Sequence, residues 1–280
     1  MSSVLFDVPG PRARARHRIY AVIFVVLSLA VLYWAFRRLQ SEEVITSDVF
    51  NEAYQDNNVE FMIDGLVGTL KAAGLAILIS LVFGAVFAVG RLSDHAFVRL
   101  PAVAVIEFFR AVPLVLLIVI IYFSFKNTLG LLGSLVAGLT LYNGSVLAEV
   151  FMAGILAVAK GQSEAAYALG MRKTQVMSGI LFPQAVKFML PAIISQCVVV
   201  LKDTSLGFVI VYPEVVRNTR QIALFVDNGT VVVFGTAAVM YIVINYSLSK
   251  LAEYLERRLS QRGQGRAVRQ VEAVATDTGA

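Results

Sequence analysis

The sequence predicts an all-α polytopic membrane protein with about six transmembrane helices. Of its 280 residues, 58% are hydrophobic and 15% are charged, whereas soluble domains average about 45–50% and about 25%. Six apolar stretches are long enough to cross about 30 Å of hydrocarbon as helices, which takes roughly 17–25 residues. Lysine and arginine are also unevenly distributed between the segments that join these stretches, as in proteins oriented across a bilayer.

The six predicted spans are residues 19–36, 64–90, 101–125, 128–155, 190–212 and 230–249. A cluster of arginines precedes the first span, as in a signal peptide, but no small-residue cleavage site follows it. We therefore expect an uncleaved N-terminal anchor, with a basic tail over 1–18 and an extra transmembrane helix over 19–36. The second and fourth spans are rich in glycine, and Gly84 and Ala88 have the spacing that lets two helices approach closely. These residues predict a packed bundle.

The distribution of basic residues predicts the orientation. If the N-terminus is cytoplasmic, 16 Lys and Arg fall in the inner segments, and 5 fall in the outer ones. The inner segments are 1–18, 91–100, 156–189 and 250–280; the outer segments are 37–63, 126–127 and 213–229. This bias places both termini in the cytoplasm. The outer segment 37–63 is acidic, and the polar tail 251–280 is expected to be loosely ordered from residue 257 onward.

Several classes of function are disfavoured by the composition. The single cysteine, Cys197, rules out an internal disulfide framework, and the two histidines, His17 and His95, are too far apart in sequence to indicate a metal site. The net charge of +5 comes from arginines at the chain ends and in loops beside apolar runs, which indicates membrane orientation and not nucleic-acid binding. No Gly-x4-Gly-Lys-Ser/Thr motif occurs, so we expect no ATP hydrolysis and no catalytic residues in this chain.

The inner segment 156–189 is amphipathic and predicts a helix–turn–helix. Ser163 is the expected N-cap of the first helix, and Gly170 is the expected left-handed residue after its C-terminus. Thr174 is expected to start a second helix that ends near Pro183. From the residues alone, this segment either inserts into a groove on a partner or lies on the membrane surface.

The same segment resembles a family signature. Glu164-Ala165-Ala166, Gly170 and 180–183 resemble the EAA motif of ABC importer membrane subunits. Further stretches, in order along the chain, resemble the polar amino acid permease branch; they are 107–113, 141–149, 183–187 and 201–206. The extra first span and the opening residues resemble actinobacterial glutamate permeases. Phe182 replaces the usual leucine, and Met152 stands where the family often has arginine, so a role for that arginine is in doubt here.

The resemblance implies a type I ABC importer membrane domain over 64–250, in the bacterial cell membrane. The residues that would contact a separate ATPase are Glu164, Ala165, Ala166, Gly170 and Met171. That ATPase would bind ATP and Mg, so this chain needs no cofactor or metal of its own. The other implied partners are a second permease subunit, identical or related, and an extracytoplasmic solute-binding protein. The implied substrate is a polar amino acid, with glutamate indicated by the narrower resemblance.

Polar residues inside the predicted spans are the candidates for the substrate path, because each is costly in hydrocarbon unless it faces a partner or water. They are Glu107, Arg110, Tyr142, Asn143, Glu149, Lys202, Asp203 and Thr204. At about 1.5 Å per residue, Arg110 lies near the depth of Glu107 and Glu149, so the geometry allows a network of Arg110 with Glu107 or with Glu149. Lys202 and Asp203 fall about 18 Å from the inner end of a span that begins at 190. They point about 100° apart, so only one can face a central path.

Two interpretations of these charges stay open: ion pairs that fix helix packing, or a polar path that touches the substrate. The main alternative function is an ion-coupled secondary transporter that uses Glu107, Glu149 or Asp203 as proton sites. Such a protein typically has inverted repeats, and none is evident in this sequence. A third hypothesis, a non-transporting anchor, leaves the buried charges unexplained.

Overall fold

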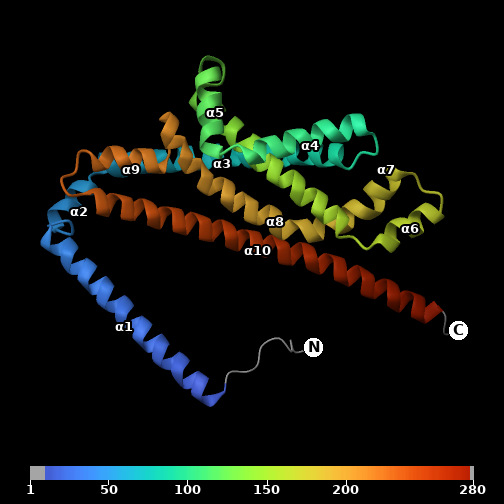
Figure 1. The fold of residues 1–280 in the computed structure, drawn as a ribbon, viewed down its shortest axis with the longest axis horizontal. Helices are drawn as coiled ribbons and strands as arrows, with labels where there is room; N and C mark the ends of the chain where they lie inside the picture. The colour runs from blue at the N-terminus through green and yellow to red at the C-terminus, as the bar shows by residue number, and fades with distance from the viewer. Residues whose placement is uncertain (1–9, 278–280) are drawn as a thin grey trace.

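The computed structural model describes residues 10–277, and within that range the chain folds into helices joined by turns (Figure 1). This confirms the all-α fold class. The longer helices are α1 (Pro11–Ser41), α3 (Asp56–Arg91), α4 (Ala96–Ala111), α5 (Leu114–Leu156), α8 (Phe182–Asp203) and α10 (Thr230–Asp277). The shorter ones are α2 (Ser47–Ala53), α6 (Lys160–Ala168), α7 (Lys173–Val176) and α9 (Val215–Ala223). A π-helix, η1 (Met177–Leu181), precedes α8, and a 3₁₀-helix, η2 (Thr204–Ile210), follows it.

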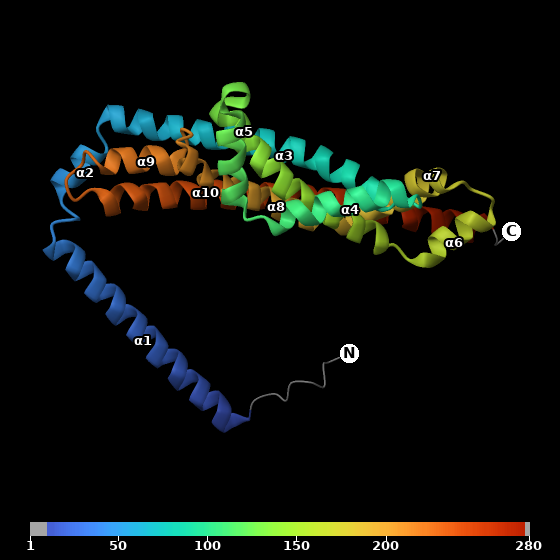
Figure 2. The same ribbon diagram turned by 45° about the horizontal axis from the view of Figure 1, so that its top comes forward.

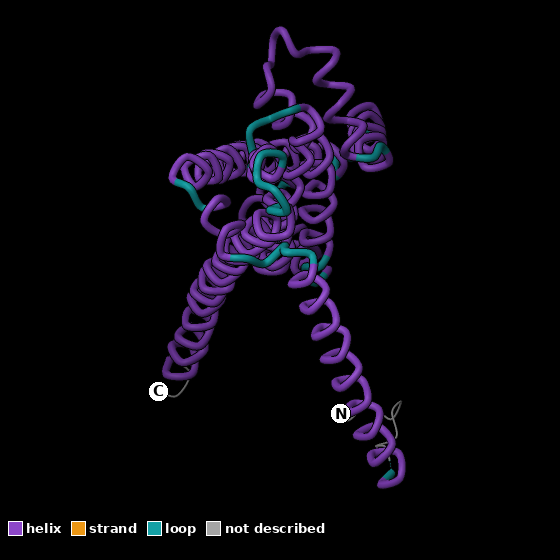
Figure 3. The backbone as a smooth tube through the Cα atoms, turned by 90° about the vertical axis from the view of Figure 1, so that its left-hand side faces the viewer, coloured by secondary structure: helices purple, strands orange, loops and turns teal. Residues whose placement is uncertain are grey.

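Helix α1 extends away from the other helices (Figures 1 and 3). Its apolar side chains are exposed along its length; Phe24 is 72% exposed and Trp34 is 68% exposed. A helix that is apolar on all sides and is not covered by protein is suited to contact lipid. The expected extra N-terminal helix is therefore present, and it is longer at both ends than the apolar stretch 19–36.

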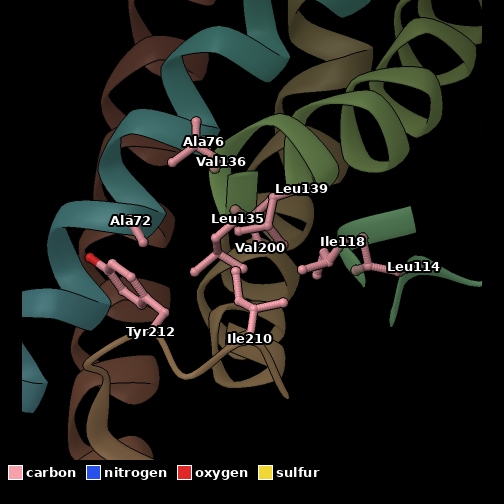
Figure 4. Close-up of a cluster of buried hydrophobic side chains, with 10 residues drawn as sticks. All are labelled: Ala72, Ala76, Leu114, Ile118, Leu135, Val136, Leu139, Val200, Ile210 and Tyr212. Atoms are coloured by element: carbon pink, nitrogen blue, oxygen red, sulfur yellow. The ribbon is translucent and has the colours of Figure 1, made fainter. Parts of the chain in front are cut away.

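The remaining long helices form an elongated bundle in which α3, α8, α9 and α10 run alongside one another (Figure 2). Its central core joins α3, α5, α8 and η2 (Figure 4). The buried residues of this core are Ala72, Ala76, Leu114, Ile118, Leu135, Val136, Leu139, Val200, Ile210 and Tyr212. Small residues bring α3 and α5 together: a Cβ on Gly84 would lie only 2.9 Å from Leu147 Cβ and 3.0 Å from the Gly144 carbonyl oxygen. The glycine pattern thus predicts the close packing, and the structure identifies α5 as the partner.

The third and fourth predicted spans are divided differently in the structure. The range 101–125 is interrupted at Val112 and Pro113, because proline has no N–H to continue the ladder of α4 and instead precedes the first residue of α5. Residues 126–127, expected as a loop, are helical, and the change of direction falls at Gly130, whose φ of +63° favours glycine. Five helices among the described residues are long and apolar enough to span a membrane: α1, α3, α5, α10 and a continuous stretch from Lys173 to Ile210.

The C-terminal tail also differs from expectation. Helix α10 continues to Asp277, so the loosely ordered stretch expected from residue 257 is helical up to that point. The tail is rich in Leu, Glu, Gln, Arg and Ala, which have high helix propensity. Residues 278–280 of this tail, and residues 1–9 of the basic N-terminal tail, lie outside the described residues.

The end of the bundle that carries α9 is held by a buried acid that the sequence did not identify. Glu214, 0% exposed, accepts hydrogen bonds from the backbone N–H groups of Val216 (2.8 Å) and Arg217 (2.6 Å) and so caps α9. Thr69 of α3 accepts a hydrogen bond from Val215 N–H at 3.2 Å, which joins α9 to α3. Burial raises the pKa of Glu214 to about 7, and the two backbone hydrogen bonds only partly oppose this shift.

Candidate functional site

At the opposite end of the bundle, α6 and α7 form a helical hairpin, residues 160–176 (Figure 1). Helix α6 ends at a left-handed glycine, Gly170, with φ +77°. Gly170 N–H donates to the Tyr167 carbonyl at 2.9 Å, and Met171 N–H donates to the Ala166 carbonyl at 3.2 Å. This is the Schellman pattern of a helix C-terminus. The expectation for Gly170 is confirmed, and because no atom lies within 4 Å of an added Cβ, only the backbone angle requires glycine.

The start of the hairpin was predicted wrongly. Helix α6 begins at Lys160 and its N-cap residue is Ala159, one turn before Ser163. The Ser163 hydroxyl instead donates to the Lys160 carbonyl at 2.8 Å. Serine inside a first turn satisfies its hydroxyl through the carbonyl behind it, and this competes with its use as a cap.

The second helix of the hairpin does not end near Pro183, as expected, but continues through η1 into α8. Pro183 is the second residue of α8, and because the helical residues of η1 precede it, its missing N–H leaves one hydrogen bond of the continuous helix unmade. Helix α7 starts at Lys173, one residue before Thr174, and Arg172 N–H donates to the Gln175 side chain at 2.8 Å. The hairpin is therefore covalently continuous with a long apolar helix, without an intervening loop.

The hairpin presents a small, mostly uncovered surface. Glu164 and Ala165 are exposed, Tyr167 is 48% exposed, and Leu169 at the tip is 83% exposed. Ala166 is 2% exposed, so it packs inside the hairpin and fixes its shape. A narrow alanine-containing ridge with an apolar tip has the shape of an element that enters a groove.

Among the polar residues in the spans, Glu149 of α5 binds two arginines; Arg91, Arg110 and Glu149 are hereafter the Glu149 cluster. Arg110 Nη1, from the end of α4, lies 3.1 Å from Glu149 Oε1. Arg91 Nη1, from the end of α3, donates to the same oxygen. The network of Arg110 therefore forms with Glu149. Glu107 is exposed, and the structure gives it no ion pair within the described residues.

Arg91 was assigned to an inner loop because it directly follows the predicted span, but α3 continues through it. Two guanidinium groups around one carboxylate leave the cluster with an excess positive charge. The Arg110 side chain remains 45% exposed, and a guanidinium has five donors, more than one carboxylate oxygen uses. The Glu149 cluster can therefore accept a further anionic group.

A second polar group, the Asn143 cluster, joins α5 to α8 through Asn143, Gln196 and Asp203. Gln196 Nε2 donates to Asn143 Oδ1 at 2.6 Å, and Asn143 Nδ2 donates to Asp203 Oδ2 at 3.4 Å. Asn143 is fully buried, whereas Gln196 and Asp203 are half-buried. Gln196 was missed, although it lies seven residues before Asp203, on the same face of the helix.

The residues that flank these clusters face elsewhere. Lys202 is exposed and lines an open cavity of about 520 Å³ with Ser205 and Tyr241, in agreement with the expectation that only one of Lys202 and Asp203 faces the interior. Thr204 is fully buried, and its hydroxyl donates to the Leu201 carbonyl at 2.7 Å. Tyr142 packs, half-buried, against the central core.

The two clusters occupy different faces of α5. Asn143 and Glu149 are six residues apart, which places them about 9 Å apart along the helix and about 120° apart around it. Helix α8 also begins at Phe182, eight residues before the predicted span, so the distance of Asp203 from its inner end is about 30 Å and not 18 Å. The pairing with Asn143 keeps Asp203 beside the middle of the second arm of α5, the part that follows Gly130.

Comparison with known proteins identifies relatives of this chain. Residues 80–261 match the family described as "Binding-protein-dependent transport system inner membrane component". The chain is 43% identical over 205 residues to the glutamate transport system permease protein GluD of Corynebacterium glutamicum, covering 71% of this chain and 75% of that protein. It is 34% identical to the probable glutamine ABC transporter permease protein GlnP of Bacillus subtilis, over 75% of this chain and 98% of that protein.

Solved structures give the same result. The subunit in a crystal structure of an amino acid ABC transporter with histidines is 30% identical and superposes with a TM-score of 0.69, covering 76% of this chain and all of that chain. A subunit of the MetNI methionine ABC transporter superposes with a TM-score of 0.65 over 73% of this chain and 99% of that chain. At 18% identity, the second match supports the fold alone.

Proposed function

This chain belongs to the family of binding-protein-dependent transport system inner membrane components, and on that premise we propose that it is the permease subunit of an ATP-driven importer of polar amino acids. Its fold is that of a type I ABC importer membrane domain with one additional N-terminal helix. The observation that carries the proposal is the hairpin at residues 160–176, which combines the family signature with an exposed ridge on a rigid turn.

In this proposal the hairpin seats in a groove of a separate ATPase subunit. Glu164 and Ala165 form its contact surface, and the Gly170 turn, with Met171, holds the two helices at a fixed angle. ATP and Mg are bound by the ATPase. The hairpin is flanked by α5 on one side and is continuous with α8 on the other, so closure of two ATPase subunits would move both helices together. This geometry suits a subunit that transmits force to the substrate path.

The two polar clusters are the proposed contacts for the substrate. The Glu149 cluster has an excess positive charge, which suits a carboxylate. The Asn143 cluster contributes the carboxylate of the half-buried Asp203, which suits an ammonium group. A polar amino acid carries both groups, and because the clusters lie on different faces of α5, they would contact it at different positions along its path. The identity to a glutamate permease makes glutamate the proposed substrate.

The proposed assembly contains two permease subunits, two ATPase subunits and an extracytoplasmic solute-binding protein, in the bacterial cell membrane. With the two arms of α5 on either side of Gly130 counted separately, the chain crosses the bilayer six times. Both termini, including the polar tail 251–280, then lie on the cytoplasmic side with the hairpin, where the inner segments carry most of the lysine and arginine. The acidic segment 37–63 and α9 then lie on the outer side.

Reconstituted uptake tests this proposal. The complex is purified from its native membrane through a tag on this chain and reconstituted into vesicles, with ATP and Mg²⁺ on the hairpin side and the binding protein with labelled glutamate on the other. We expect accumulation that requires ATP and persists when an ionophore collapses the proton gradient. Uptake that ignores ATP and follows the gradient would instead support the secondary-transporter alternative. Competition with unlabelled glutamine and arginine identifies the preferred amino acid.

A further inference from the structure

A lysine outside the family signature connects the hairpin to a different helix. Lys173 is the first residue of α7, and its ammonium lies 2.5 Å from Asp94 Oδ2, in the turn between α3 and α4. The same ammonium donates to the backbone carbonyl of Leu92 at 3.2 Å. Leu92 is the C-cap residue of α3, so Lys173 places a positive charge at the C-terminal end of that helix. A cation there is favoured by the helix dipole and satisfies a carbonyl that the helix leaves free.

Among the described residues, α3 has no extensive contact with α6 or α7. An apolar cavity of about 480 Å³ separates the last turns of α3 from η1 and the start of α8; its walls include Val89, Phe151, Met177 and Met189. Leu92, Asp94 and Lys173 also line this cavity. Densely packed side chains transmit displacement, whereas a cavity does not. The Lys173 contacts therefore bridge a gap that packing leaves open.

The segment that follows α7 departs from regular α-helix geometry. The π-helix η1 follows α7 directly, and π-helical turns are uncommon and occur frequently at functional sites. Without the Lys173 contacts, the hairpin would be joined to the bundle through α5 and through η1 and α8, and it would reach α3 only by way of these helices. Helix α3 packs closely along α5 through Gly84, so its coupling to the hairpin determines whether the bundle moves as one unit.

We propose that Lys173 is a positioning residue that ties the hairpin to the end of α3, so that movement of the hairpin is transmitted to α3 as well as to α8. The proposal rests on the assignment of the hairpin as the ATPase contact. The Lys173 charge and hydrogen bond also lower the pKa of Asp94, as expected for a paired carboxylate. No residue of this contact belongs to the polar clusters, so its loss should affect coupling and leave substrate contacts intact.

The test measures amino acid imported per ATP hydrolysed by the reconstituted complex. We expect Lys173→Met to lower this ratio about two- to fivefold, the range corresponding to loss of an exposed ion pair. Asp94→Asn should lower it less, because the Leu92 carbonyl remains as a partner. Lys173→Arg should keep most of the coupling. Lys187→Met, which removes an exposed lysine of α8, is the matched control and should leave the ratio unchanged.

Two further measurements separate a positioning role from a general loss of structure. The exchanged pair Asp94→Lys with Lys173→Asp should recover coupling that Lys173→Asp alone loses. Because Asp94 and Lys173 are solvent-exposed, added salt on the hairpin side should lower the wild-type ratio but not that of Lys173→Met. A Lys173→Met ratio equal to that of Lys187→Met, or no recovery in the exchanged pair, overturns the inference. If the wild-type complex shows no ATP-dependent uptake, the proposed function itself fails.

Discussion

Arg110 of α4 and Glu149 of α5 form an ion pair 3.1 Å long across 39 residues of sequence. The same carboxylate also binds Arg91, so one acid holds the ends of α3 and α4 against α5. This arrangement explains how a chain with few charged residues can place three of them within its apolar helices. Each charge is offset by a neighbour on another helix, and the excess positive charge remains at the partly exposed Arg110.

Replacing Glu149 with glutamine should destabilise the bundle. The substitution leaves two arginines with no carboxylate, and for the mostly buried Arg91 this costs about 1–3 kcal/mol. We expect a lower midpoint of thermal unfolding in detergent. Glu107→Gln removes an acid from an exposed position of α4 and should leave the midpoint nearly unchanged. Equal midpoints for the two variants would show that the Glu149 cluster does not hold the helices together.

The sequence was most informative where a local signal decides the structure. Apolar length predicted the membrane helices, and Gly170 predicted the left-handed turn, since both depend on neighbouring residues alone. Ser163 was misassigned because a serine near a helix start can either cap the helix or donate its hydroxyl to a carbonyl of the preceding turn, and Ser163 does the second. The break between the third and fourth spans was expected at the polar residues 126–127, but the helix continues through them and changes direction at Gly130.

The polar residues were only partly predictable for a different reason. Arg110 and Glu149 stood out as charges inside apolar runs. Gln196 and Glu214 gave weaker signals, because their roles come from contacts with α5 and with the N-terminus of α9 that only the assembled bundle creates. The sequence around Lys173 does not distinguish it from other cytoplasmic lysines, because its role depends on the end of α3, which lies beside it only in the folded chain.

Valine at position 170 should prevent association with the ATPase. A side chain in the left-handed region costs about 1–2 kcal/mol, and more for a β-branched residue, so the turn should open and the angle between α6 and α7 should change. We expect Gly170→Val to insert into the membrane but to lose the ATPase on co-purification. Gly179→Val, at a glycine that is equally uncrowded but not left-handed, should retain it. Normal recovery of the ATPase with Gly170→Val would contradict the assignment of the hairpin.

Leucine at position 143 should impair transport as well as stability. It removes the partner of both Gln196 and Asp203, and a polar group left buried without a hydrogen bond costs about 1–3 kcal/mol. We expect a lower unfolding midpoint and reduced uptake. Ser145→Ala is the control, because the buried Ser145 hydroxyl donates only to the Leu141 carbonyl of its own helix. If Asn143→Leu lowers the midpoint but not the uptake rate, the cluster serves packing and not the substrate.

Enlarging Gly84 should separate α3 from α5. A Cβ there would meet Leu147 and the backbone of α5 at about 3 Å, so a leucine forces the helices apart, at a cost of about 1–3 kcal/mol. Gly74 lies on the same helix, and a Cβ there meets no atom within 4 Å. Gly74→Leu should therefore fold normally, whereas Gly84→Leu should unfold at lower temperature. Equal unfolding temperatures for the two variants would show that α3 and α5 can move apart without loss of stability.

Glu214 should make the stability of the bundle depend on pH. Its pKa is raised from an ordinary value of 4.5 to about 7 by burial, so the folded chain binds a proton that the unfolded chain has already released. Stability from this group is therefore greatest below pH 4.5 and falls as the pH rises to 7. Above that pH the loss amounts to about 3 kcal/mol, since one pKa unit corresponds to about 1.4 kcal/mol.

Glutamine at position 214 removes this titration and keeps an oxygen to cap α9. We expect the unfolding midpoint of Glu214→Gln to decline less between pH 5 and pH 8 than that of the wild type, so that the two curves converge at low pH. Asp227→Asn removes an exposed acid from the turn between α9 and α10 and should follow the wild-type curve. Because Tyr241 donates a hydrogen bond to Glu214 at 3.4 Å, Tyr241→Phe should leave the acid less well solvated and steepen the decline. Parallel curves for the wild type and Glu214→Gln would mean that the buried acid stays charged at every pH tested.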